Sequence, residues 1–134
     1  MQKLIKNLLG HKKSALLISV FYTLFLLVVC LVSLDGVPSP GIKHVDKIFH
    51  FLSYFILMLL WYNSFSKFFT NNFLKVIFLS FIFCVAFGIV VEGLQNTLTS
   101  SRTADIKDII ANTCGVLAGA ILVKFLRKLH VKKL

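Results

Sequence analysis

Long apolar runs separated by short polar segments dominate the pattern of this chain of 134 residues. The four runs cover residues 14–34, 48–65, 76–91 and 104–125. They are continuously apolar, whereas the strands of a membrane β-barrel alternate between apolar and polar positions. Because a helix rises about 1.5 Å per residue, about 20 apolar residues cross the hydrocarbon core of a bilayer. The pattern predicts an all-α membrane protein with four transmembrane helices in a compact bundle.

Two local features refine this prediction. The third run is short for a complete span, so we expect its helix to continue through Gln95, which places Glu92 inside the helix. Trp61 and Tyr62 come near the far end of the second run, where aromatic residues often form a belt at the membrane surface. We therefore expect both rings to lie at that interface.

The composition excludes an ordinary soluble domain. The apolar fraction is 57% and the charged fraction 15%, against about 45–50% and about 25% for soluble domains. The net charge of +10 comes from basic residues at the ends of the apolar runs, not from a basic polar face. This placement indicates contact with the lipid bilayer and argues against nucleic-acid binding.

The distribution of charge predicts the orientation. With the N-terminus inside, eleven of the 15 Lys and Arg residues lie on the cytoplasmic side and all five acids lie toward the outer side. The positive-inside rule therefore predicts that both termini are cytoplasmic. Residues 1–13 and 126–134 are then basic cytoplasmic ends, and residues 14–125 form the transmembrane domain. We expect the location to be the plasma (inner) membrane of a bacterium.

Polar side chains gather at the predicted outer ends of the second, third and fourth helices. Ionisable groups inside a membrane helix are energetically costly and usually face the bundle interior or a water-filled cavity. Helical spacings of three and four residues place these groups on shared faces. The candidate cluster comprises Asp46, His50, Tyr54, Glu92, Gln95, Arg102, Asp105, Asp108 and Asn112.

Structural explanations exist for several of these residues. Asp46 and Asp105 have the sequence positions of helix N-caps. His50 is equally consistent with a buried histidine bonded to Asp46 or to the backbone. Glu92 has the alternative of reaching the headgroup region and pairing with Arg102 or Lys107.

A stripe of small residues predicts close helix packing. Ala111, Gly115 and Gly119 are four residues apart, the spacing that lets two membrane helices approach closely. Gly88 on the third helix is a further candidate for such contact.

The order and spacing of these residues resemble the VanZ-like family of bacterial membrane proteins over about residues 14–125. The resemblance rests on Asp46-Lys47-x-x-His50-Phe51-x-x-Tyr54, on Glu92-x-x-Gln95, and on Arg102-x-x-Asp105-x-x-Asp108-x-x-x-Asn112-x-x-Gly115-x-x-x-Gly119. The family often has Pro-Gly-Arg at the turn where this chain has Ser100-Ser101-Arg102. The resemblance implies a multi-helix membrane protein, and the founding member is associated with low-level resistance to teicoplanin.

Three functions fit the predicted cluster. An envelope accessory protein would bind a lipid headgroup, a lipid-linked cell-wall precursor or a lipoglycopeptide. An enzyme acting on a lipid-linked substrate would use His50 as a base oriented by Asp46, with the acidic residues as additional acid–base groups or as ligands of a divalent cation. A purely structural cluster would fix helix register. The chain has no H-E-x-x-H or nucleophile motif, and we predict neither a dedicated metal site nor a cofactor.

Overall fold

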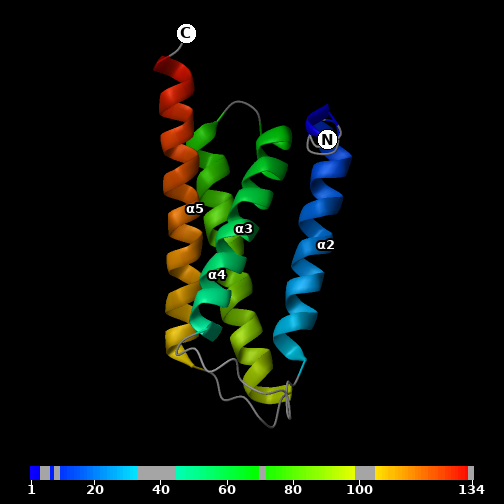
Figure 1. Ribbon diagram of the computed structural model, residues 1–134, viewed down its shortest axis with the longest axis vertical. Coiled ribbons are helices and arrows are strands. Elements are labelled where there is room, and N and C mark those ends of the chain that lie inside the picture. Colours follow the sequence, from blue (N-terminus) through cyan, green and yellow to red (C-terminus); the bar gives the residue numbers. More distant parts are fainter. Residues whose placement is uncertain (4–6, 8–9, 33–44, 70–71, 99–104, 133–134) are drawn as a thin grey trace.

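Four long helices form the described part of the protein. The computed structural model describes residues 1–3, 7, 10–32, 45–69, 72–98 and 105–132. The helices are α2 (Lys12–Leu31), α3 (Val45–Phe68), α4 (Phe73–Leu98) and α5 (Ile106–Lys132). They pack together in alternating directions, so that α2 begins and α5 ends at the same end of the bundle (Figure 1). Each helix is long and apolar enough to span a membrane, which confirms the predicted all-α four-helix class.

The helices are longer than most of the predicted runs. The second helix begins at Val45 instead of residue 48, and the fourth continues from the predicted residue 125 to Lys132. Hydropathy marks only the part of a helix that fits hydrocarbon, whereas the backbone stays helical into the polar boundary. The extension to Lys132 contains Leu, Arg and Lys, which favour helix, and it contains no Gly or Pro.

The contact between α3 and α5 is the most extensive one between helices. It is close because α5 presents glycine to the backbone of α3. A Cβ atom added at Gly115 would collide with the carbonyl oxygen of Phe51, and one added at Gly119 would lie 3.0 Å from the Cβ of Met58. Ala111 is partly buried one turn before Gly115. Two of the three stripe positions therefore have no room for a larger side chain.

Hydrogen bonds to backbone carbonyls attach α2 to the bundle. The Ser19 hydroxyl lies 3.0 Å from the carbonyl oxygen of Leu60 and 2.9 Å from that of Ala15 in its own helix, so the two acceptors share its proton. The Tyr22 hydroxyl donates to the carbonyl of Ser53 at 3.1 Å. Since lipid offers these hydroxyls no partner, bonds to a neighbouring helix hold α2 in place.

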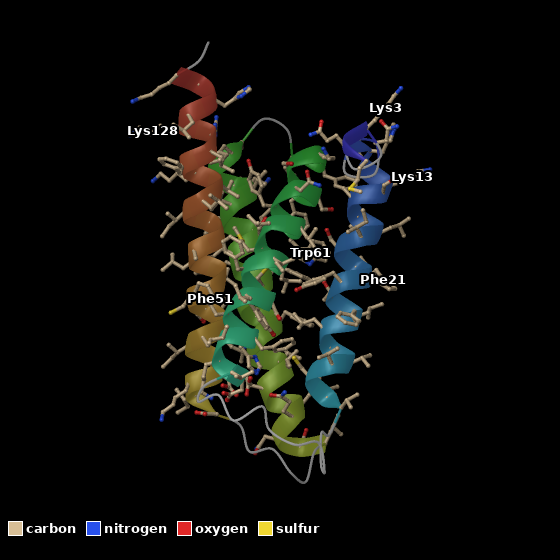
Figure 2. All side chains as sticks on the ribbon, in the orientation of Figure 1. Lys3, Lys13, Phe21, Phe51, Trp61 and Lys128 are labelled. Atoms are coloured by element: carbon tan, nitrogen blue, oxygen red, sulfur yellow. The ribbon has the colours of Figure 1, made fainter. Side chains whose placement is uncertain are left out.

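Trp61 differs from its predicted position at the membrane surface. Its side chain is 7% exposed and lies between α2 and α3 (Figure 2). The indole Nε1–H donates to the Thr23 hydroxyl at 3.0 Å, and the ring packs against Phe83 at 4.2 Å between centroids. The predicted interfacial position of Trp61 is wrong, because its N–H has a partner inside the bundle and the ring is buried with it.

Opposite charges occupy opposite ends of the described bundle. Lys3, Lys13 and Lys128 mark the basic end, where α2 begins and α5 ends (Figure 2). There the Arg127 guanidinium lies 3.8 Å from the centroid of the Phe73 ring. The acids of the described residues belong to the other end, where α3 and α5 begin and α4 ends.

The α3–α5 contact predicts a large difference between two glycine substitutions. Gly115→Ala should lower the free energy of unfolding by about 1–3 kcal/mol, the usual range for overpacking, because its Cβ meets backbone. The matched variant is Gly93→Ala, since an added Cβ there has nothing within 4 Å. It should be neutral or stabilising by up to about 1 kcal/mol. Thermal unfolding of the purified proteins in detergent measures both, and equal midpoints would contradict the close contact.

Candidate functional site

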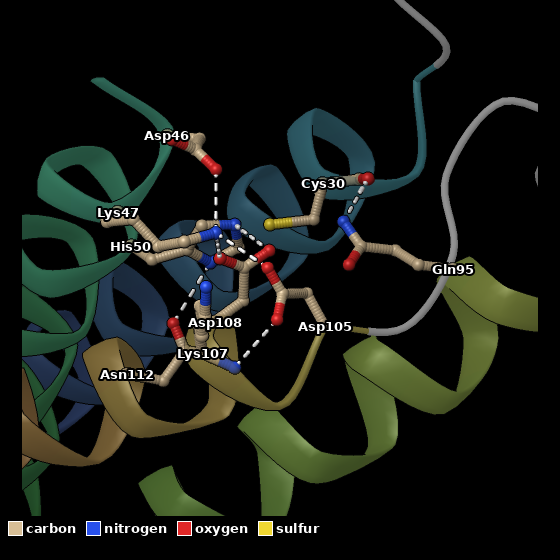
Figure 3. A network of polar contacts seen from close by, with 9 residues as sticks. All are labelled: Cys30, Asp46, Lys47, His50, Gln95, Asp105, Lys107, Asp108 and Asn112. Atoms are coloured by element: carbon tan, nitrogen blue, oxygen red, sulfur yellow. Dashed lines mark hydrogen bonds and ion pairs between the residues drawn. The ribbon is translucent and has the colours of Figure 1, made fainter. Parts of the chain in front are cut away.

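Lys47 is the centre of a charged network that joins the first turns of α3 and α5. Its Nζ lies 2.8 Å from Asp46 Oδ2, 2.9 Å from Asp105 Oδ2 and 2.5 Å from Asp108 Oδ1 (Figure 3). An ammonium group has three N–H donors, so each donor has its own carboxylate. The Lys47 side chain is 22% exposed, which leaves the network partly shielded from water. Lys47 therefore fixes the start of α3 against the start of α5.

Asp105 acts both as a helix cap and as part of this network. Its Oδ1 accepts a hydrogen bond from the backbone N–H of Lys107 at 2.9 Å, while its Oδ2 faces Lys47. The Lys47 ammonium, followed by the Lys107 N–H, holds the pKa of Asp105 below its ordinary value. Asp46, in contrast, lies within the first turn of α3, where a carboxylate interacts favourably with the helix dipole.

His50 lies one turn further into the membrane and is bonded to α5. Its Nδ1 is 3.0 Å from Asn112 Oδ1, and its Nε2 is 3.8 Å from Asp108 Oδ2. Because an amide oxygen can only accept, the bond to Asn112 makes Nδ1 the protonated nitrogen. Asp108 therefore contacts Lys47 through Oδ1, while its Oδ2 lies on the side of His50.

Glu92 comes from α4 and completes an inner group with His50 and Asp108. One ligand atom from each of the three residues lies within 4.8 Å of the other two. Glu92 is only 1% exposed, yet neither of its carboxylate oxygens has a hydrogen-bond partner among the described residues. A buried carboxylate without donors is unusual and costly.

Tyr54 and Asn112 meet beside this inner group at Gly88. A Cβ added at Gly88 would lie 3.0 Å from Tyr54 Cε1 and 3.3 Å from Asn112 Nδ2. Gly88 precedes Glu92 by four residues, so the two share a face of α4. Tyr54 Oη and Asn112 Nδ2 are also buried without a partner within the described part of the chain.

Two further candidates of the predicted cluster are Gln95 and Arg102. The Gln95 Nε2 donates to the carbonyl of Cys30 at 2.7 Å, which directs this side chain to α2 (Figure 3). Arg102 lies outside the described residues. The structure therefore brings six predicted residues together around Lys47: Asp46, His50, Glu92, Asp105, Asp108 and Asn112.

Three partnerships differ from those considered for the sequence. Asp46 contacts Lys47, while His50 is bonded to Asn112 and lies beside Asp108. Glu92 does not pair with Lys107, whose side chain is exposed. Lys47, although part of the family motif, was not among the predicted members of the polar cluster. Its spacing to His50 and Tyr54, three and then four residues further along an otherwise apolar helix, was the signal for its place on the same face.

The sequence model of the VanZ/LLP1 family matches residues 9–127. This match spans all four helices, and the chain belongs to the VanZ/LLP1 family of membrane proteins. No curated protein and no solved structure matches it.

Removal of the central lysine tests the charged network. Lys47→Met should lower the free energy of unfolding by about 1–3 kcal/mol, because it leaves three neighbouring carboxylates without their shared cation. Lys107→Met is the matched control and should change stability by less than about 0.5 kcal/mol, since its side chain is exposed. Thermal unfolding in detergent at neutral pH distinguishes the two.

The difference in stability between the wild type and Lys47→Met should also depend on pH. The pKa of Asp105 is lowered from 3.8, so its stabilising contribution is complete above that value and is lost as the pH falls through the lowered pKa. The gap between the wild type and Lys47→Met should therefore narrow in acid. A gap that stays constant from neutral pH to pH 3 would contradict the role given to the network.

Proposed function

We propose that this protein is an envelope accessory protein that binds the polar head of a lipid-tailed molecule at the acidic end of its bundle. The bound molecule belongs to one of three classes: a membrane lipid, a lipid-linked cell-wall precursor or a lipoglycopeptide of the teicoplanin type. The proposal rests on the convergence of polar groups from three helices at that end of the bundle.

We place the acidic end on the extracytoplasmic side of the bacterial plasma membrane. The support comes from the concentration of Lys and Arg at the opposite end, where the positive-inside rule expects the cytoplasm. Both termini are then cytoplasmic. Lipid-linked precursors and antibiotics in the outer leaflet would meet the network directly.

The balance of charge at the network indicates which chemical group it recognises. Among the described residues, four carboxylates converge with Lys47, which already directs its three donors to aspartates, and the exposed Lys107 adds one further positive charge near Asp105. A phosphate group would meet repulsion there, whereas an ammonium group would meet attraction. Asp46 and Asp105 have side chains 55% and 41% exposed, so a headgroup can reach them. The recognised part is therefore an amine.

The other two functions have less support. The enzyme reading needed Asp46 to orient His50, and Asp46 contacts Lys47 instead. A purely structural cluster should satisfy its own buried atoms. Instead, both Glu92 oxygens and the Tyr54 hydroxyl have no partner among the described residues, which favours a site that awaits a ligand.

Stabilisation by defined lipids tests the recognition of an amine. Phosphatidylethanolamine should raise the unfolding midpoint of the detergent-purified wild type more than phosphatidylglycerol does. The double variant Asp46→Asn/Asp105→Asn should lose this preference while remaining folded, because exposed ion pairs contribute only about 0–1 kcal/mol. Lys107→Gln, at the same end of the bundle, should keep the preference. Equal midpoints with the two lipids in the wild type would refute amine recognition.

Labelling of intact cells tests the orientation. Single reporter cysteines, Lys107→Cys and Lys128→Cys, are introduced into a background without the three native cysteines. A membrane-impermeant maleimide should label position 107 and spare position 128 until the cells are lysed. The reverse pattern would show that the acidic end faces the cytoplasm.

A further inference from the structure

His50, Glu92 and Asp108 form a group with the composition of a metal site. They come from α3, α4 and α5, and one nitrogen or oxygen from each lies within 4.8 Å of the other two. His50 and Glu92 are 3% and 1% exposed, and Asp108 has a side chain 16% exposed. They lie deeper than Asp46 and Asp105, which face the membrane surface. The inner group is therefore separate from the carboxylates that a headgroup can reach.

The unpartnered carboxylate of Glu92 points to a missing cation. Neither oxygen has a hydrogen bond of good geometry from a described residue, and a nearby donor, the backbone N–H of Asp105, interacts with the carboxylate only weakly. The nearby ammonium of Lys47 attracts this carboxylate through space, but its three hydrogen-bond donors are directed to aspartates. A carboxylate in this position needs either a proton or a positive ion to make its burial tolerable.

Two further contacts hold the histidine and the aspartate in orientations suited to a metal. The bond from His50 Nδ1–H to Asn112 Oδ1 leaves the lone pair of the imidazole on Nε2, the nitrogen that faces Asp108. Lys47 binds Oδ1 of Asp108, so that Oδ2 is the oxygen on the histidine side. Metal-binding histidines usually donate their other N–H to such an outer partner.

We propose that His50 Nε2, one Glu92 oxygen and Asp108 Oδ2 bind a divalent transition-metal ion such as Zn²⁺ or Mn²⁺. Two carboxylates balance the charge of the ion, and a mixed imidazole and carboxylate set suits these metals. Metal–ligand bonds of about 2.0–2.2 Å place adjacent ligands about 3–3.5 Å apart. Nε2 and Oδ2 now lie 3.8 Å apart and all three ligand atoms lie within 4.8 Å of one another, so the side chains must move closer together to bind the ion. Water or the headgroup of a bound lipid would fill the remaining coordination positions of the ion.

Metal content of the purified chain tests this site. The full chain, with any polyhistidine tag removed, is stripped with EDTA, dialysed against Zn²⁺ or Mn²⁺ and assayed by elemental analysis. The wild type should retain about one ion per chain, as one three-ligand site predicts. Glu92→Gln and His50→Gln should weaken the affinity at least about tenfold, because even outer partners contribute about 10–100-fold. Lys107→Gln, a change at an exposed side chain at the same end of the bundle, should retain the ion.

Co²⁺ supplies a second readout that needs no variant. Binding to the wild type should give visible absorption bands of a nitrogen- and oxygen-ligated ion, and one equivalent of Zn²⁺ should abolish them. Size-exclusion chromatography shows whether each variant is folded. A wild type that retains none of the three ions overturns the proposal, and so does unchanged retention by folded Glu92→Gln. The lipid preference of Asp46→Asn/Asp105→Asn is measured without metal, so headgroup recognition and metal binding succeed or fail separately.

Discussion

The approach of α3 to α5 is the constraint on which the rest of this structure depends. Gly115 lets the two backbones touch at Phe51, and the polar groups of both helices lie within two or three turns of that point. Lys47 and His50 reach their partners on α5 at 2.5–3.0 Å, distances that a wider separation of the helices would not allow. The missing side chain of Gly115 thus makes possible the contacts of Lys47 and His50 with the first turns of α5.

The sequence predicted the four helices because lipid imposes a simple requirement. A chain that crosses hydrocarbon must satisfy its own backbone, and long apolar runs do so as helices. The ends of the helices were less predictable, since α5 continues to Lys132 through residues that are polar yet favour helix. Trp61 was misplaced for a related reason: its hydrogen-bond partner, Thr23, belongs to another helix and is not visible from local sequence.

The convergence of most of the candidate polar residues was predictable, whereas their pairings and the central position of Lys47 were not. Polar residues inside apolar helices stand out because their burial is costly, and six of the nine predicted residues meet around Lys47. Which atoms meet depends on the rotation of each helix and on side-chain rotamers. Gln95 therefore turned to the Cys30 carbonyl, although it lies only three residues from Glu92. Lys47, adjacent to an aspartate, was easily taken for a surface charge.

The attachment of α2 has an evolutionary consequence. Ser19, Tyr22 and Gln95 supply three of the donors at this boundary, and their acceptors are the main-chain carbonyls of Leu60, Ser53 and Cys30. A carbonyl is present whatever side chain the residue carries. The accepting positions of these three bonds are thus free to diverge among relatives, whereas the side-chain pair of Trp61 and Thr23 is the part of the boundary that would leave pairwise covariation for sequence comparison to detect.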